Sequence, residues 1–370
     1  MQVPLFRSDL SDDLVREELS DAFQQVLASG NLVLGDKVVA FEEAFAEYLG
    51  VDFCVGVANG TDAIELGLRS LGVGPGSKVA TVSNAGFYTS TAAIAIGAKP
   101  VFMDISLDDG LLTLAEAEAV LVRERPSVIV LTHLYGQMVP DSGVISDLAR
   151  SLGVKVLEDC AQAHGAILEG RMAGSFGDVS SFSFYPTKNL GGLGDGGAVV
   201  TSSPEINQSL RQLRQYGWET KYNVVIAGRN SRLDELQAAF LLARLPKLDL
   251  HNKRRVQVAK MYKLGITERP GRMTHVKRDW SGSFVGHLFV MKVKHELRDD
   301  LRGYLSEAGV ASTIHYPVPD HLQPFMQEWD YPALARTEEW SDTILSLPLF
   351  PSMSDEEAEY VIRAVNSWKP

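Results

Sequence analysis

Cysteine is scarce in this chain of 370 residues, with Cys54 and Cys160 as its two examples, both in apolar runs that predict buried strands. Two such residues provide neither a disulfide framework nor the ligand set of a structural zinc site, so we expect no metal. A basic excess is missing too, because 47 acidic residues outnumber 35 basic ones and give a net charge of −12. This balance argues against nonspecific binding to nucleic acid or anionic membranes, although a local basic pocket could still bind an anionic substrate.

Long apolar runs are also absent. No uninterrupted stretch approaches the ~20 residues that a membrane span requires, and residues 1–7 lead into acidic positions rather than into the apolar core of a signal peptide. We therefore expect a soluble, cytoplasmic protein.

What the first half of the chain does contain is an alternation of short Val- and Ile-rich runs with amphipathic segments. Such runs predict strands at residues 53–57, 79–82, 100–103, 128–131 and 154–157. Helices are expected between them, near residues 63–71, 88–96, 113–123 and 141–152. This order is typical of a mostly parallel sheet covered on both faces, in which ligands bind beyond the carboxyl ends of the strands. Two earlier helices, near 11–29 and 36–49, are expected to form an arm outside the sheet.

The second half is predicted to be mainly helical before it returns to mixed structure. Helices are expected near residues 205–215, 233–245, 247–264, 296–308 and 355–367, and strands near 284–293 and 311–314. Pro246 provides a natural break. The fold predicted is α/β, with a large domain at 1–245 that includes the N-terminal helical arm and a smaller α+β domain at 246–370.

One lysine is surrounded by unusual residues. Lys188 follows a short predicted strand that Pro186 ends, and five glycines occupy the seven positions 191–197. Such density indicates backbone with φ > 0 or backbone that passes very close to something, although most lysines are solvated and most glycine clusters are turns.

The same glycines match a dinucleotide-binding fingerprint. Gly192, Gly194 and Gly197 have the required spacing, but that motif must open a helix. Residues 198–201 instead read as a strand, so we reject a Rossmann-type site.

Polar residues occur where the predicted strands end. Asp159 and Glu158 point to opposite faces of one strand, so only one of them is expected to be functional. Gly60 and Thr61 lie at a helix N-terminus, which favours a phosphate, although a simple N-cap is the commoner role of such a threonine. A carboxylate such as Asp159 can likewise be a mere helix cap.

Two further side chains lie near these strand ends. Tyr88 stands at the next strand-to-helix junction, where a lone tyrosine is usually core, and the hydroxyl of Ser183 needs a partner. Together with Lys188 they suit an aromatic cofactor that carries a phosphate. A lysine can bond to an aldehyde, a carboxylate can hold a pyridinium proton, and an aromatic ring can stack on the cofactor, which is the chemistry of pyridoxal 5′-phosphate (PLP).

The chain resembles the nucleotide-sugar aminotransferases of the DegT/StrS type, within the fold-type I PLP enzymes. The resemblance covers nearly the whole chain and rests on five motifs in order: residues 59–63 (NGTDA), 158–165 (EDCAQAHG), 181–189 (SFSFYPTKN), 194–197 (GDGG) and 228–232 (GRNSR). Each motif is weak by itself, but the ordered set is specific.

The resemblance implies a role for each matched residue. Lys188 would bond the cofactor and carry the proton, Asp159 would pair with the pyridinium nitrogen, and Gln162 would lie at the cofactor's hydroxyl edge. Phosphate contacts are implied for Gly60, Thr61 and Ser183. Asn230 would reach the phosphate from the neighbouring subunit of a homodimer with shared active sites.

Some segments depart from the commoner family pattern. Tyr88 aligns with the ring-stacking aromatic, with Phe87 as a competitor, and Asp195 stands where many members carry glutamate. Residues 84–88, 216–222 and 314–323 look most like members that aminate C3 of a dTDP-3-keto-6-deoxyhexose. His315, Tyr316 and His321 are then candidates for the sugar or nucleotide end of the pocket, although their segment could equally be a rigid proline turn.

The resemblance predicts a ping-pong transamination. L-glutamate would donate the amino group and the keto sugar would accept it, which gives an amino sugar for polysaccharide or natural-product glycosylation. A deoxysugar dehydratase is disfavoured because those relatives place histidine at the position of Lys188. A 4-keto-sugar or keto-cyclitol aminotransferase stays open, as does a non-catalytic PLP-binding module.

Overall fold

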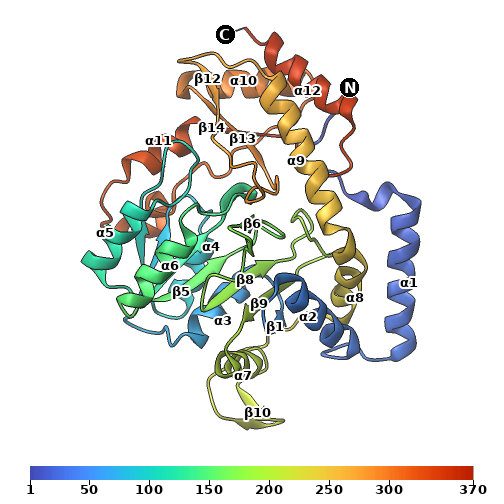
Figure 1. The fold of residues 1–370 in the computed structure, drawn as a ribbon, viewed down its shortest axis with the longest axis vertical. Helices are drawn as coiled ribbons and strands as arrows, with labels where there is room; N and C mark the ends of the chain where they lie inside the picture. The colour runs from blue at the N-terminus through green and yellow to red at the C-terminus, as the bar shows by residue number, and fades with distance from the viewer. Residues whose placement is uncertain (370) are drawn as a thin grey trace.

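The computed structural model describes residues 1–369, apart from the side chain of Ser11, and contains a seven-stranded sheet at its centre (Figure 1). The strand order is β1-β9-β8-β5-β4-β2-β3, and every strand runs parallel to the others except β9. The strands are β1 (Phe53–Val57), β2 (Lys78–Val82), β3 (Lys99–Met103), β4 (Val128–Thr132), β5 (Lys155–Asp159), β8 (Val179–Ser183) and β9 (Gly197–Thr201). The predicted α/β fold with a mostly parallel sheet is confirmed.

Helices cover both faces of this sheet because each presents an apolar stripe to it. One face packs against α3 (Gly60–Ser70), α4 (Tyr88–Ala95) and α7 (Pro204–Leu213). The other packs against α2 (Asp36–Leu49), α5 (Leu114–Glu124), α6 (Ser142–Ser151) and α8 (Glu235–Arg244). Within residues 1–369, no helix is both long enough and apolar enough to span a bilayer.

The two N-terminal helices behave differently from each other. Helix α1 (Asp13–Ser29) is an outer arm that packs on α8. Helix α2 was also expected in that arm, and this was wrong, because its Phe41 and Phe45 pack against Phe182 and Phe184 in the core under the sheet.

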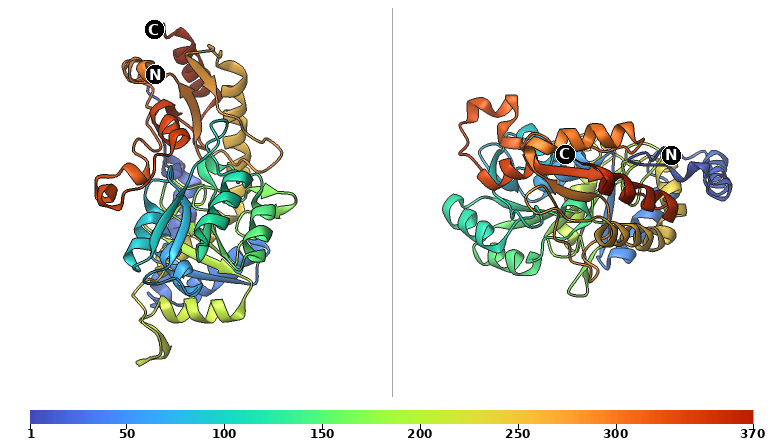
Figure 2. Two further views of the ribbon diagram at one scale, coloured as in Figure 1. Left: turned by 90° about the vertical axis from the view of Figure 1, so that its left-hand side faces the viewer. Right: turned by 90° about the horizontal axis from the view of Figure 1, so that it is seen from above.

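The C-terminal part of the chain lies at one end of the molecule, and the small β10–β11 hairpin (Trp218–Thr220, Asn223–Val224) projects from the opposite end (Figures 1 and 2). A long helix, α9 (Leu248–Gly265), leads into this part. The C-terminal part contains an antiparallel sheet of β12 (Met273–His275), β13 (Phe289–Val293) and β14 (Ile344–Leu347). It also contains the helices α10 (His295–Glu307), α11 (Ala335–Thr343) and α12 (Asp355–Ser367).

Some details of this part differ from expectation. The strand predicted at 311–314 was wrong, because Thr313 forms only an isolated bridge to Ser346. Helix α11 and strand β14 were not predicted. Val3 pairs with Val310 and packs in the C-terminal core, so the first residues join that end rather than the sheet domain. The domain boundary after residue 245 stays a prediction.

The glycine-rich segment is explained by close approach. None of its five glycines has a positive φ, but a Cβ on Gly197 would lie 2.3 Å from the carbonyl oxygen of Asn59, and one on Gly191 would lie 2.6 Å from that of Pro186. Gly197 begins β9, so no helix opens there and the rejection of a Rossmann-type site is confirmed.

A buried carboxylate joins α2 to the β1 edge of the sheet. Glu42 accepts a hydrogen bond from the Gly56 amide at 2.8 Å and pairs with the buried Arg214 and with Arg211.

Glu42→Ala should lower the free energy of unfolding by about 3–5 kcal/mol, because it leaves the Arg214 charge buried without a partner. Denaturant unfolding measures this. Glu43→Ala, at an exposed position on the same helix, should change the free energy of unfolding by less than about 0.5 kcal/mol. Equal losses of stability in the two variants would contradict this role of Glu42.

Candidate active site

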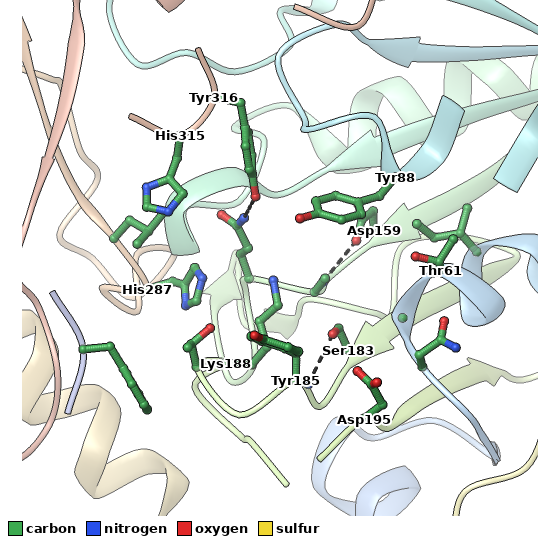
Figure 3. A pocket seen from close by; sticks show the side chains of 18 of the residues that line it. Thr61, Tyr88, Asp159, Ser183, Tyr185, Lys188, Asp195, His287, His315 and Tyr316 are labelled. Carbon is green, nitrogen blue, oxygen red and sulfur yellow. Dashed lines mark hydrogen bonds between the residues drawn. The ribbon is translucent and has the colours of Figure 1, made fainter. Parts of the chain in front are cut away.

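A cavity of about 670 Å³ opens at the carboxyl ends of the parallel strands, where ligands bind in sheets of this kind (Figure 3). Its lining includes most of the residues singled out from the sequence, namely Gly60, Thr61, Tyr88, Asp159, Gln162, Ser183, Lys188, His315 and Tyr316. These residues come from the ends of β5 and β8, the loops that follow these two strands, the starts of α3 and α4, and the segment that follows α10.

One end of the cavity is formed by the N-terminus of α3. Asn59 caps this helix, its side chain accepting from the Asp62 amide at 2.8 Å. The N-cap role considered for Thr61 was therefore wrong. A Cβ on Gly60 would lie 2.6 Å from that of Ser183, so only glycine lets the helix start approach the end of β8. Free amides, a helix dipole and two hydroxyls thus meet where a phosphate would fit.

Lys188 lies across the cavity from that end, on the loop after β8 (Figure 3). Burial lowers the pKa of its amine to about 8, and the nearby charge of Asp159 opposes this shift. Among the residues described, Nζ makes no ion pair within 4.0 Å. The amine is therefore neutral far more often than that of an exposed lysine at physiological pH.

Asp159 and Glu158 separate onto opposite faces of β5, as the strand period requires. Asp159 lines the cavity and accepts a hydrogen bond from the Ala161 amide at 3.1 Å. Burial raises the pKa of its carboxyl, and the hydrogen bond from Ala161 and the charge of Lys188 oppose this. A buried carboxylate that keeps an open side suits a cationic partner such as a pyridinium N–H.

Glu158 is instead fully buried and fully engaged. It accepts hydrogen bonds from His133 Nε2 at 3.0 Å, from the amides of Gly174, Phe176 and Gly177, and from the Ser180 hydroxyl. These donors outweigh its burial and lower the pKa of its carboxyl. Cys160 completes a trio with His133 and Glu158 whose ligand atoms lie within 4.8 Å of one another. Because the Glu158 oxygens are already taken, this trio supports the backbone and does not offer a metal site.

Gln162 is held in place by a network from Tyr135, a residue that the sequence did not single out. The Tyr135 amide donates to Gln162 Oε1 at 2.6 Å, and Gln162 Nε2 donates to the Tyr316 hydroxyl at 3.2 Å. The Tyr135 hydroxyl donates to the carbonyl of His315 at 2.9 Å. Burial, with the charge of Lys188, lowers the pKa of His315 to about 4. This wall of the cavity is therefore rigid and uncharged.

Tyr88 lines the cavity and Phe87 does not. The Tyr88 side chain is 48% exposed and its ring meets that of Tyr316 edge to face, with centroids 6.1 Å apart. Phe87 turns away to pack on the cluster around Phe102 and Met326. Of these two aromatic residues, Tyr88 is thus the one that is available to a ligand in the cavity.

Two predicted site residues do not line the cavity. His321 is buried behind it, with Nδ1 bonded to the Ser83 hydroxyl at 2.7 Å and Nε2 to Glu338 at 3.2 Å. These contacts fasten the C-terminal segment to the loop after β2, so a substrate contact for His321 was wrong. Asn230 is exposed and bridges to Gln215. Its contact across a dimer stays a prediction.

The cavity also contains polar residues that sequence reasoning missed, namely Asn59, Tyr185, Thr187, Asp195, Arg255 and His287. Asn59 and Asp195 lie inside quoted motifs and could have been found there. Arg255 and His287 stand in segments without a motif, so their approach to Lys188 is a product of the tertiary fold alone.

These residues fit PLP. The lysine with a lowered pKa, the carboxylate with an open side and the helix N-terminus whose close approach to β8 only glycine permits are separate requirements of that cofactor, and one cavity meets all of them. The fold and the cavity together define a PLP-dependent enzyme.

Comparison with known proteins places the chain within this class. Residues 13–366 match the DegT/DnrJ/EryC1/StrS aminotransferase family, and the chain belongs to it. It is 42% identical to the dTDP-3-amino-3,4,6-trideoxy-alpha-D-glucose transaminase of Micromonospora megalomicea subsp. nigra over 95% of this chain and 94% of that one. It is 41% identical to the dTDP-3-amino-3,6-dideoxy-alpha-D-galactopyranose transaminase of Aneurinibacillus thermoaerophilus, over 95% and 96%. The crystal structure of DesV from S. venezuelae in complex with a ketimine intermediate superposes with a TM-score of 0.94 at 40% identity, over 99% and 98%.

The lowered pKa of Lys188 predicts how cofactor loading depends on pH. Only the neutral amine can attack an aldehyde, so covalent binding of PLP by the cofactor-free protein should accelerate as pH rises and reach half its maximal rate near pH 8. Stopped-flow absorbance measures this, with lysine whose α-amine is acetylated as the control in the same buffers. A midpoint above pH 10, like that of an ordinary lysine, would be inconsistent with a buried amine.

The two carboxylates of β5 should respond oppositely to isosteric change. Asp159→Asn should lower kcat by roughly 10²- to 10³-fold and leave the melting temperature within a few degrees, since it removes the charge of a carboxylate that lines the cavity. Glu158→Gln should lower the stability by about 1–3 kcal/mol, because its new amide N–H groups meet donors. Thermal unfolding and steady-state kinetics of both variants test this, and a kcat loss confined to Glu158→Gln would reverse the assignment.

Proposed function

We propose that this protein transfers an amino group from L-glutamate to a nucleotide-linked keto-deoxysugar, with a dTDP-3-keto-6-deoxyhexose as the acceptor. The observation that carries the proposal is the shared cavity, in which the Lys188 amine, the Asp159 carboxylate and the N-terminus of α3 converge. Membership of an aminotransferase family supports it.

Each residue has a distinct task in this proposal. Bound PLP supplies an aldehyde carbon to which amines add and a ring that accepts the electrons of a broken C–H bond. Lys188 Nζ would hold the proton lost from the donor's α-carbon and return it. Asp159 would keep a proton on the ring nitrogen. Gln162 would lie at the ring's hydroxyl edge and Tyr88 would stack on its face.

The phosphate and the sugar would bind at separate parts of the cavity. Gly60, Thr61 and Ser183 would hold the phosphate. His315 and Tyr316, which are fixed by Tyr135 and Gln162, would face the sugar. The choice of C3 as the aminated carbon follows the 3-amino sugars in the names of two relatives, whose products differ at C4. The amino sugar would serve polysaccharide or natural-product glycosylation.

We further propose a cytoplasmic homodimer with shared active sites. Asn230 would enter the phosphate end of the partner's cavity from the exposed loop that it occupies. Exposed apolar side chains on the nearby hairpin, including Tyr222 and Val224, support a subunit contact there.

The test is the visible spectrum of the PLP-loaded protein before and after L-glutamate. Glutamate should convert the yellow cofactor band to that of the pyridoxamine form, because Lys188 moves the donor's proton. Keto sugars linked to dTDP should then restore the yellow band. Lys188→Ala should lose both conversions and still bind the cofactor noncovalently, since the phosphate recess is untouched.

The alternatives give different spectra. A cofactor band that glutamate and other amino acids leave unchanged would indicate a PLP-binding module and contradict the proposal. Recovery with a 4-keto sugar or a keto-cyclitol, but not with a 3-keto sugar, would keep the transamination and overturn the acceptor. Full activity in Lys188→Ala would overturn the assignment of that residue.

A further inference from the structure

Helix α4, whose first residue is Tyr88, has no side-chain cap of its own. Phe87 stands at the N-cap position with φ at 70°, and its apolar side chain makes no hydrogen bond to the helix. N-cap positions usually carry Ser, Thr, Asp or Asn, whose side-chain oxygens bond free amides of the first turn. The start of this helix, which presents Tyr88 to the cavity, therefore depends on groups from elsewhere in the chain.

A buried carboxylate from the C-terminal part supplies those contacts. Asp320 Oδ1 accepts a hydrogen bond from the Phe87 amide at 2.9 Å, and its Oδ2 accepts one from the Ser90 hydroxyl at 2.6 Å. In a capping box, an acidic or amide side chain at the third helical position accepts from the N-cap amide. Ser90 holds that position in α4, and Asp320 bonds the N-cap amide from outside the helix.

The same C-terminal segment is also fastened to the loop that follows β2. The Asp320 amide donates to the carbonyl of Ser83 at 2.7 Å, and the His321 amide donates to the Ser83 hydroxyl oxygen at 3.0 Å. Asp320 is 1% exposed and has no ion-pair partner within residues 1–369. Hydrogen bonds alone thus hold its carboxyl at the start of α4.

The two segments that Asp320 joins meet again inside the cavity. Tyr316 lies on the segment of Asp320, and its ring contacts that of Tyr88 edge to face, with centroids 6.1 Å apart (Figure 3). Gly86 lies beside both rings with φ at 81°, and a Cβ there would be 2.9 Å from the Tyr316 ring. Pro317 and Pro319 restrict the backbone between Tyr316 and Asp320. A change at Asp320 should therefore alter how the two tyrosines lie.

We propose that Asp320 is a positioning residue, which fixes Tyr88 against Tyr316 and thereby determines how tightly the cavity holds the flat ring of its cofactor. This inference rests on the contact between Tyr88 and the cofactor in the proposed function. Asp320 does not line the cavity, so it acts through Tyr88. Because the Tyr88 side chain is 48% exposed, a ligand must order it on binding, and a backbone that is already fixed lowers this cost.

Asparagine is the conservative replacement for this carboxyl. Burial raises the pKa of Asp320 to about 7, and the hydrogen bonds from Ser90 and Phe87 oppose the shift. The carboxyl is therefore partly protonated at neutral pH, so an uncharged group of the same shape suits its surroundings. In Asp320→Asn, the amide oxygen can accept from the Phe87 amide and the amide nitrogen can donate to the Ser90 hydroxyl oxygen.

The experiment compares Asp320→Ala and Asp320→Asn with Glu235→Ala, and repeats Asp320→Ala in a Tyr88→Ala background. Glu235 is a matched control, because it too is buried and bonds the start of a helix without a side-chain cap, accepting from the Lys37 and Val38 amides at 2.9 and 3.1 Å. It does not line the cavity. Titration of the cofactor-free proteins with PLP, followed by absorbance, measures affinity without turnover, and thermal unfolding measures stability.

Asp320→Ala should weaken PLP binding by roughly 3- to 10-fold, because the start of α4 is no longer fixed. Asp320→Asn should keep the affinity within about twofold, since it restores both hydrogen bonds. Glu235→Ala should lower the melting temperature, as Asp320→Ala does, and leave PLP affinity unchanged. In the Tyr88→Ala background, Asp320→Ala should cause no further loss of affinity, because the ring that it positions is missing.

Unchanged PLP affinity in Asp320→Ala would overturn the proposal. An equal loss in Glu235→Ala would overturn it too, by showing a general effect of lost stability, as would an undiminished loss in the Tyr88→Ala background. If Asp320→Ala does not fold, Ser90→Ala decides, because it removes one of the two bonds and should weaken PLP binding by roughly 2- to 5-fold only when Tyr88 is present. Failure of the PLP-loaded protein to react with glutamate would contradict the proposed function alone, because PLP binding needs no turnover.

Discussion

The site depends on burying the amine of Lys188 so that its pKa falls, while a nearby carboxylate limits how far the pKa falls. Burial pushes the pKa of Lys188 down to about 8, and Asp159 pulls in the other direction. Full exposure would leave the amine protonated and unreactive at neutral pH, whereas a direct ion pair would hold it as a cation. The loop after β8 therefore has to place Nζ near the carboxylate but not on it, and the close packing of glycines 191–197 against their neighbours fixes that loop.

Residues outside the cavity maintain this geometry from the C-terminal part of the chain. Asp320 accepts hydrogen bonds from the Phe87 amide and the Ser90 hydroxyl, so it holds the start of α4, where Tyr88 begins the helix. His321 fastens the same segment to Ser83. Tyr88, which lines the cavity, is thus positioned by a segment more than two hundred residues away in sequence.

The sequence was informative where function follows from local order along the chain. Strand ends carry the site in a parallel sheet, so Asp159, Ser183 and the start of α3 could be identified from strand prediction, and the alternation of faces separated Asp159 from Glu158. The prediction that His321 contacts the substrate was wrong. Its neighbourhood in sequence to Tyr316, which lines the cavity, does not show that its side chain instead forms a hydrogen bond with Ser83 behind the cavity. Arg255 and His287 could not be predicted, since only the packing of α9 and the segment before β13 against the loop brings them to Lys188.

The short elements of the C-terminal part show a second limit. Strand β14 was missed and a strand at 311–314 was wrongly expected, because both segments are only four residues long. The partner that makes one of them a strand, β13, lies far away in sequence. The boundary after residue 245, the dimer and the contact from Asn230 remain predictions that depend on surfaces which a single chain leaves exposed.

The central claim is that Lys188 is the amine that bonds the cofactor. Borohydride reduction of the PLP-loaded protein, followed by peptide mapping with mass spectrometry, tests it most directly, with the cofactor-free protein treated in parallel. The account predicts one pyridoxyl adduct, on the peptide that contains Lys188 and at that residue. An adduct on another lysine, or none in a protein that retains the yellow band, would contradict it.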